Sequence, residues 1–137
     1  MDLHTKEQRS YNMSRIKSKN TAPEKVLFKL LRNSGFKFRR HPHLPGKPDA
    51  ILIQHKVAIF VDGEFWHGRN FNKWKERLSP FWYEKISQNI KRDRKNRRLL
   101  KELDWQVVRL WGRSLIKEPQ NSLNKIIELI QKSQRKN

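Results

Sequence analysis

Two runs of apolar residues decide the fold of this chain: Asp49-Ala-Ile-Leu-Ile-Gln54 and Val57-Ala-Ile-Phe-Val-Asp62. Both are short and rich in β-branched residues, so they predict two strands of one hairpin. If His55-Lys56 forms the turn, the register sets Asp49 opposite Asp62, and directly opposed side chains lie on one face of a sheet. Two carboxylates so close repel each other unless a cation lies between them. His-Lys is a poor two-residue turn, however, and a longer loop would shift this register.

The residues around the hairpin carry chemistry. Leu44-Pro-Gly-Lys-Pro-Asp49 leads into it, and Val61-Asp-Gly-Glu-Phe-Trp-His67 ends it, so this segment holds three carboxylates and a histidine. Glu64 falls on the same face as Asp62 if the strand continues. Carboxylate oxygens are the ligands of hard cations such as Mg²⁺, and a histidine can take a proton from water near neutral pH. The plain alternative is that the acids belong to strand ends and turns and that His67 is a surface side chain.

Charge indicates the partner. The 137 residues include 32 Lys and Arg against 13 Asp and Glu, a net charge of +19, and no Cys. Phosphate relieves the repulsion within so basic a chain, so we expect a nucleic acid as partner, with an anionic membrane as the lesser alternative. No apolar run is long enough to span a bilayer, and the start Met1-Asp-Leu-His-Thr lacks a signal peptide's apolar core. We therefore expect a cytoplasmic protein without a membrane partner, and without disulfides or thiolate metal sites.

The order of predicted elements is α-β-β-β-α-β-α, which predicts an α/β fold with a mixed sheet flanked by helices. Thr21 caps a first helix that Gly35 ends, and strands follow at 36–41, 49–54 and 57–62. A long helix over 81–103, a strand over 105–111 and a last helix from Pro119 complete the order. We expect a basic arm over 1–20, one domain over 21–133 and a basic tail over 134–137.

Two acids on helices have two interpretations each. Asp93 stands in the core-facing stripe of the long helix, where an apolar residue is expected and an acid needs a partner. It pairs either with Arg97 one turn later or with His67 at the site. Glu24 is explained locally as the capping-box residue of the first helix, and a role at the site can coexist with that. His41, His43 and His55 have no comparable context, and we expect no role for them.

A resemblance rests on residues that occur in a fixed order from near the N-terminus to about Leu115. They are Arg9-Ser10, Asn12-Met13, Thr21-Ala22, Glu24-Lys25, Leu44-Pro-Gly, Pro48-Asp49, Phe60, Gly63, Phe65-Trp-His67, Phe81-Trp82, Glu84-Lys-Ile86, Asn89, Arg92-Asp-Arg94 and Val108 to Trp111. With these residues the chain resembles the very-short-patch repair endonucleases, which nick DNA beside a T:G mismatch and belong to the restriction-endonuclease-like PD-(D/E)xK group. The resemblance implies a restriction-endonuclease-like core and a Mg²⁺-dependent DNA endonuclease in which Mn²⁺ substitutes.

The resemblance also implies a site. We expect Asp49, Asp62 and Glu64 to hold the metal, His67 and Asp93 to position or activate water, and Glu24 to support the site from outside the ligand shell. Glu24, Asp49, Asp62, His67 and Asp93 are thus the expected catalytic set.

Aromatic residues are the expected means of recognition. In the family, the aromatics that match Phe65, Trp66 and Trp82 insert between base pairs, and the residue that matches Met13 enters from the other groove. Such wedges cost a few kcal/mol of unstacking, and a mismatch is cheaper to unstack. We expect Lys85, Lys91 and Arg94, on the long helix, to contact the phosphates of double-stranded DNA bound by a monomer.

The chain departs from the family in ways that leave its target open. The family's zinc is held by cysteines and a histidine, whereas the corresponding positions here include Glu64, Arg69 and Phe71, so we expect no zinc and packing of 70–78 through Phe71, Trp74 and Leu78 instead. Asp62 stands where the family has a histidine, and the lysine of the PD-(D/E)xK pattern is missing two residues later. Two alternatives remain: a phage-defence, restriction or mobile-element endonuclease on the same scaffold without mismatch specificity, and a DNA-binding protein without catalysis.

Overall fold

The structure, a computed structural model, describes residues 21–64 and 66–136, so the predicted arm and its Met13, as well as Phe65, lie outside the described residues. Its elements in chain order are α2 (Ala22–Asn33), β1 (Phe38–Arg40), β2 (Ala50–Leu52), β3 (Val57–Asp62), α3 (Phe71–Trp74), the 3-10 helix η1 (Lys75–Arg77), α4 (Pro80–Glu102), β4 (Gln106–Trp111), α5 (Gly112–Lys117) and α6 (Pro119–Lys136). The predicted order is confirmed, with the short helices α3, η1 and α5 added to it. α6 continues past the predicted boundary at residue 133.

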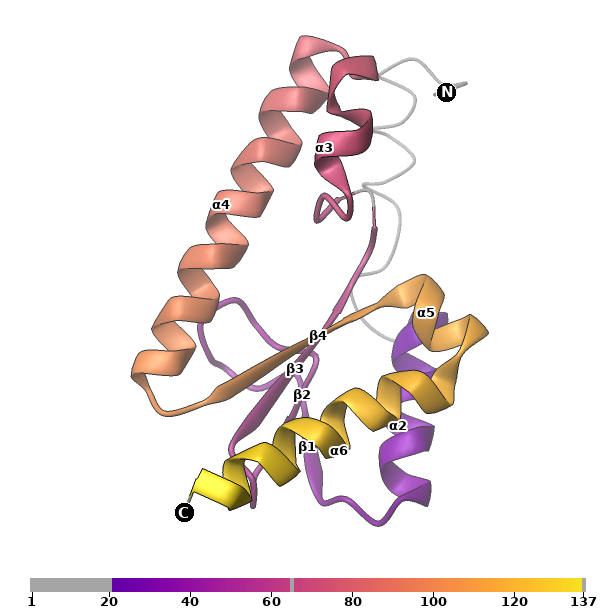
Figure 1. Ribbon diagram of the computed structural model, residues 1–137, viewed down its shortest axis with the longest axis vertical. Helices are drawn as coiled ribbons and strands as arrows, with labels where there is room; N and C mark the ends of the chain where they lie inside the picture. The colour runs from indigo at the N-terminus through magenta and orange to yellow at the C-terminus, as the bar shows by residue number, and fades with distance from the viewer. Residues whose placement is uncertain (1–20, 65, 137) are drawn as a thin grey trace.

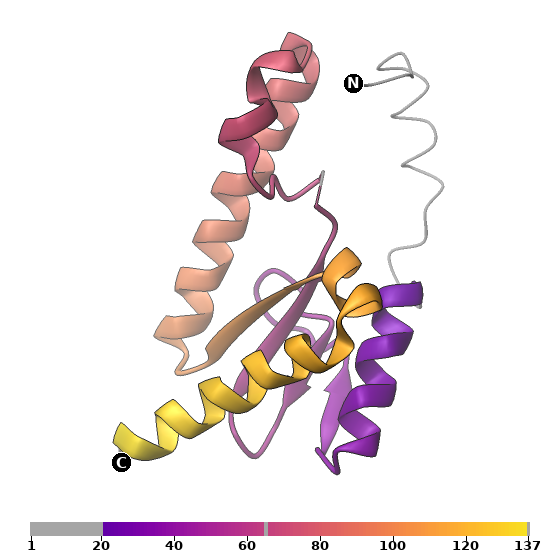
Figure 2. The ribbon, with the colours of Figure 1, turned by 45° about the vertical axis from the view of Figure 1, so that its right-hand side comes forward.

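The strands form one mixed sheet in the order β1-β2-β3-β4. β1, β2 and β3 pair antiparallel, while β3 and β4 pair parallel, because the long helix α4 carries the chain back between them. Helices α2 and α6 cover one face of the sheet, and α4 lies on the other side (Figures 1 and 2). The sheet is therefore flanked by helices, as predicted.

The predicted hairpin forms with the longer of the two turns considered, so the register that sets Asp49 opposite Asp62 does not occur. Leu52 pairs with Val57 and Ala50 with Ile59, so residues 53–56 form a four-residue turn in place of the expected two-residue one. Lys56 adopts a left-handed backbone there, with φ of 51°, which the longer turn accommodates. Asp49 lies just before β2, where its N–H donates to the Ile59 carbonyl. It is therefore not paired with Asp62, and its side chain joins Glu24 of α2.

Alternation along β3 divides the apolar core in two. Val57 and Ile59 join the larger cluster, which α2, α5 and α6 complete. Ala58 belongs to the smaller cluster on the opposite face, where Leu100 from the C-terminal half of α4 covers it and Phe60 packs at its margin. Asp62 follows Ala58 and Phe60 on that second face, at the end of the strand. The fold thus brings an acid to the point where the sheet and α4 diverge.

The loop after β3 is held against α4 by close packing at Gly68. This glycine has φ of +70°, and a Cβ added to it would lie 2.5 Å from Cδ1 of Ile90. Only glycine therefore fits both the backbone conformation and the space. Beyond it, α3 lies beside the N-terminal end of α4 (Figure 1). Within residues 21–64 and 66–136, no helix combines the length and the apolarity needed to cross a bilayer.

Candidate active site

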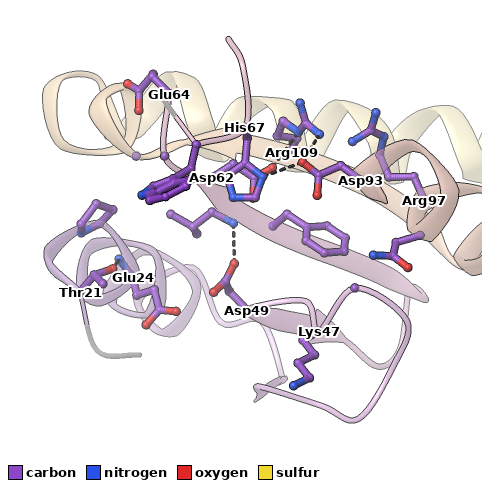
Figure 3. Close-up of a pocket in the computed structure, with 18 of the residues that line it drawn as sticks. Thr21, Glu24, Lys47, Asp49, Asp62, Glu64, His67, Asp93, Arg97 and Arg109 are labelled. Atoms are coloured by element: carbon purple, nitrogen blue, oxygen red, sulfur yellow. Dashed lines mark hydrogen bonds and ion pairs between the residues drawn. The ribbon is translucent and has the colours of Figure 1, made fainter. Parts of the chain in front are cut away.

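The predicted acids and His67 line one cavity between the ends of β2 and β3, the start of α2 and the middle of α4 (Figure 3). They do not form a single cluster. Asp62, His67 and Asp93 converge on one side, and Glu24, His41 and Asp49 converge on the other. The two groups have different partners.

His67 lies between two carboxylates. Its Nδ1 is 2.6 Å from Oδ2 of Asp93, and its Nε2 is 3.6 Å from Oδ1 of Asp62 (Figure 3). Asp93 therefore joins His67, as one of the two interpretations predicted, and none of its ion pairs in the described part of the chain goes to Arg97. A carboxylate at Nδ1 fixes that nitrogen as the donor of the neutral ring, which leaves Nε2 as the proton acceptor.

Arg109 supplies positive charge to this first cluster. Its Nε lies 2.8 Å from Oδ2 of Asp62, and its Nη2 lies 3.6 Å from Oδ2 of Asp93. Burial disfavours the charged form of Asp93, but the hydrogen bond with His67 and the charges of His67, Arg92 and Arg109 outweigh it and hold the pKa of Asp93 below its usual value. At Asp62, burial dominates and raises the pKa, although His67 and Arg109 oppose it.

The second cluster is formed by Glu24, His41 and Asp49. Asp49 accepts a hydrogen bond from the Val61 N–H at 2.6 Å. It also contacts the carboxyl of Glu24, which is buried with 2% of its surface exposed. Burial and the contact with Glu24 raise the pKa of Asp49 to about 8, against the lowering effect of the Val61 N–H. Two adjoining carboxyls therefore hold a proton, or another cation in its place.

Glu24 reaches this position from the first turn of α2. Thr21 caps the helix as predicted, because its Oγ1 accepts a hydrogen bond from the Glu24 N–H at 3.4 Å. The carboxylate of Glu24 does not turn back to the cap, as a capping-box residue would, but lies 3.8 Å from His41 Nε2. The N–H of Glu24 therefore serves the helix cap, while its side chain lines the cavity.

Glu64 lies apart from both clusters. Its carboxylate accepts a hydrogen bond from the Arg113 N–H at 3.2 Å and lies 3.9 Å from Arg69. The guanidinium of Arg69 also donates to Ser114 Oγ at 3.2 Å and stacks over the ring of Trp111. Arg69 therefore ties the loop after β3 to the start of α5, at one of the positions where the resemblance implies zinc.

The aromatic residues of the loop and of α4 pack on one another. Phe71 contacts Trp74 and Tyr83 at ring-centroid distances of 5.4 and 5.5 Å, so the expected packing of this segment through Phe71 and Trp74 is confirmed. Trp66 meets Trp82 edge to face at 5.5 Å. Trp82 is only 1% exposed, so it supports Trp66 from below and does not itself reach the surface.

The predicted basic contacts lie on the exposed side of α4. Lys85, Lys91 and Arg94 are all exposed, and Lys85 Nζ lies 5.3 Å above the ring of Trp66. They follow the same helix that brings Asp93 to the cavity, so phosphate contacts along α4 would place a DNA backbone beside the first cluster.

Sequence reasoning missed two residues of these clusters, Arg109 and His41. Arg109 had a signal, because it is a charged residue within the apolar strand 106–111, and alternation puts it beside Phe60 on the face of Asp62. His41 had none, since it stands in an irregular connection and reaches Glu24 only through the pairing of β1 with β2.

Carboxylates and histidines around one cavity of a strongly basic chain are typical of a metal-dependent nuclease. Comparison with known proteins is more specific. The sequence matches the DNA mismatch endonuclease Vsr family over residues 1–73. It is 37% identical over 138 residues to the type II nicking enzyme V.NmeDIP of Neisseria meningitidis serogroup C, covering 98% of this chain and 93% of that enzyme.

Two further relatives agree. The DNA mismatch endonuclease Vsr of Escherichia coli (strain K12) is 40% identical over 113 residues, covering 80% of this chain and 72% of that protein. The type II nicking enzyme V.HpaIIP of Haemophilus parainfluenzae is 38% identical over 125 residues, with coverage of 88% and 89%. The chain therefore belongs to the Vsr endonuclease family.

Proposed function

We propose that this protein is a divalent-metal-dependent DNA endonuclease that nicks one strand of a duplex at or near a T:G mismatch. The observation that carries the proposal is the pair of clusters on one cavity, a histidine held by Asp93 and the adjoining carboxyls of Glu24 and Asp49. The first can accept a proton and the second can hold a cation, which are the two requirements of metal-assisted phosphodiester hydrolysis.

The second cluster fits a divalent cation by its donors. Two adjoining carboxyls repel each other when both are ionised, and a buried nitrogen of His41 lies beside them without a hydrogen-bond partner in the described residues. We expected Asp62 and Glu64 among the ligands, but Arg109 and the Arg113 N–H already occupy their carboxylates. We therefore assign the cation to Asp49 and Glu24, with Mg²⁺ as the expected ion and Mn²⁺ as a substitute.

A cation held there would supply positive charge to the phosphate under attack and to its leaving oxygen. Side chains of the protein would handle the proton of the attacking water. His67 Nε2 takes the proton of the attacking water, and Asp93 keeps the ring in the required tautomer and stabilises its charged form. Arg109 holds Asp62 and Asp93 in place, so that His67 lies between two oriented carboxylates.

DNA recognition is assigned to α4 and to the loop beside it. Lys85, Lys91 and Arg94 contact phosphates, and Trp66, standing on the buried Trp82, unstacks one base step. We assign the same inserting role to Phe65 and Met13, and we propose that the protein acts on intracellular DNA as a monomer. We propose no zinc site, because the chain has no Cys and Arg69 braces the loop at a position implied for a zinc ligand.

A second candidate shares this chemistry without mismatch recognition. It is supported by relatives whose names describe type II nicking enzymes, which stand beside a relative named for mismatch cleavage. A restriction-associated or defence role therefore differs from the first candidate only in the duplex that is cut. A non-catalytic DNA-binding role would leave the cavity's carboxylates unexplained, because acids next to phosphate weaken binding.

One cleavage experiment tests the proposal. The protein is incubated with a labelled duplex that contains a T:G pair, with its fully paired counterpart and with the single strand, in Mg²⁺, Mn²⁺ or EDTA. We expect a nick in the T:G duplex that requires the metal and is lost in Asp49→Asn, while Asp104→Asn, the same change at an exposed acid outside the cavity, has no effect. Equal cleavage of paired and mismatched duplexes would favour the second candidate, and metal-independent cleavage would refute both.

A further inference from the structure

His41 occupies an unusual position for a histidine without a function. Its backbone is left-handed, with φ of 46°, which is uncommon for a residue other than glycine. Its N–H donates to the Asp49 carbonyl at 3.0 Å, which ties it to the residue at the centre of the second cluster. The ring meets Phe28 edge to face, with 6.1 Å between the ring centres, and this contact orients the ring. The backbone is thus held in a strained form that aims the imidazole at the two carboxyls.

No hydrogen bond among the described residues explains why the His41 ring is oriented towards the carboxyls of Glu24 and Asp49. His41 Nε2 is buried and has no hydrogen-bond partner among the described residues, and its distance of 3.8 Å from Glu24 Oε2 is too long for one. The separation suits two ligands of one cation, because bonds of about 2.1 Å at ordinary ligand angles place ligand atoms roughly 3–4 Å apart. Ligand atoms of Glu24, His41 and Asp49 all lie within 4.8 Å of one another.

The first cluster does not compete for the cation. Asp62, His67 and Asp93 also lie within 4.8 Å of one another, but Arg109 touches both acids, at 2.8 and 3.6 Å. A divalent cation there would meet a fixed guanidinium at close range, and its repulsion would oppose binding.

We propose that His41 Nε2 is a direct ligand of the divalent cation held by Glu24 and Asp49, and that this nitrogen makes the site prefer Mn²⁺ over Mg²⁺. The inference rests on the proposed function, because it concerns the cation of the same site. Oxygen ligands suit both ions, whereas imidazole is a ligand of transition metals and a poor one for Mg²⁺. A site with two carboxylates and one imidazole therefore binds Mn²⁺ more tightly than a purely carboxylate site of the same shape would.

The test measures cation binding to the full chain in the absence of DNA, so it does not depend on activity. Mn²⁺ affinity is obtained from the free-Mn²⁺ signal in electron paramagnetic resonance, and Mg²⁺ affinity from competition with Mn²⁺. Pulsed measurements on bound Mn²⁺ then detect a directly coordinated nitrogen. The variants are His41→Gln, Asp49→Asn and His43→Gln, the last being a matched control at an exposed histidine two residues away.

We expect nitrogen coupling in the unmodified protein, with the spectral change of isotope substitution when histidine is labelled with ¹⁵N. His41→Gln should lose the coupling and reduce the ratio of Mn²⁺ to Mg²⁺ affinity about tenfold, and His43→Gln should change neither. Bound Mn²⁺ that depends on Asp49 but shows no histidine nitrogen, or an unchanged ratio in His41→Gln, would overturn the role of His41 alone. Mn²⁺ binding that survives Asp49→Asn, or no binding at all, would overturn the cation site of the proposed function as well.

The measurement does not depend on the variant folding. Melting temperature without metal is recorded first for each variant, and the ¹⁵N-histidine comparison on the unmodified chain stands without any substitution. Absence of a histidine nitrogen in that sample is sufficient to reject the inference.

Discussion

Without a divalent cation, this protein should lose stability as pH rises from about 5 to about 7, and Asp49→Asn should remove much of that loss. The pKa of Asp49 is raised from 3.8 to about 8 by burial and by the carboxyl of Glu24. Between these values the folded chain keeps the proton and the unfolded chain has released it. Folding therefore takes up a proton, and the free energy of unfolding falls with rising pH.

The magnitude follows from one proton. Uptake of one proton on folding gives a slope of about 1.4 kcal/mol per pH unit. For a chain of this length the corresponding change in melting temperature is about 4 °C per pH unit, so two pH units lower it by roughly 8 °C. The slope levels off above the folded pKa of about 8, where both states have lost the proton.

The assay is thermal unfolding in EDTA at pH 5, 6, 7 and 8, followed by circular dichroism. The quantity of interest is the difference between the unmodified protein and Asp49→Asn, because ionisable groups remote from Asp49 contribute alike to both. Asp104→Asn serves as the control, since this acid is exposed. Millimolar Mg²⁺ or Mn²⁺ should restore the melting temperature of the unmodified protein at pH 7 and leave Asp49→Asn unchanged, because the cation replaces the proton at the carboxyl pair.

If the melting temperatures of the unmodified protein and of Asp49→Asn change equally between pH 5 and pH 7, this reasoning is refuted. Such an equal change would mean that Asp49 is ionised in the metal-free protein and that the Val61 N–H alone is enough to stabilise its charge. A rise in the melting temperature of Asp49→Asn when the cation is added would refute the assignment of the ion to this carboxyl.

Three further predictions concern cleavage and DNA binding. Asp93→Asn should reduce single-turnover nicking about 10²–10⁴-fold with DNA affinity unchanged, because the tautomer and charge of the paired histidine are lost; a rate within tenfold of the unmodified protein would contradict this. Replacing Lys85, Lys91 and Arg94 together by Gln should flatten the plot of log affinity against log salt by about three units of slope; an unchanged slope would remove α4 from the phosphate contacts. Trp66→Ala should lower the ratio of T:G to paired cleavage measured on matched duplexes, whereas an equal fall on both would limit this residue to packing.

Much of the fold was predictable from the sequence because local signals agreed with the packing. Thr21 caps its helix, Pro80 begins the long one, and the apolar runs around residues 50 and 60 form the central strands. The register was not, because it depends on turn geometry: residues 53–56 close the hairpin with a left-handed residue at Lys56, and the sequence left both a two-residue and a longer turn open.

The site was predictable only in part. The contact of Asp93 with His67 followed from one misplaced acid in an apolar stripe, combined with the resemblance. The separation of the acids into two clusters did not, because it depends on Arg109, whose strand pairs with β3 across a long crossover. Trp82 was expected at the DNA, and its burial under Trp66 results from packing at the start of α4 that no periodicity distinguishes from an exposed wedge.

The division into two clusters has a consequence for how charge changes in the cavity. Around His67, the acids already have a fixed cation, since Arg109 lies 2.8 Å from Asp62 and 3.6 Å from Asp93. Around Asp49 the proposed balancing charge is exchangeable, a proton in one state and a divalent ion in another. Binding of the ion therefore adds positive charge on one side of the cavity only, the side opposite His67, and a phosphate between the two clusters would be drawn towards the ion with His67 on its other side (Figure 3). In-line attack requires a proton acceptor and a charge for the leaving oxygen on opposite sides of phosphorus, and the proposed cation at Glu24 and Asp49 together with His67 would meet that requirement.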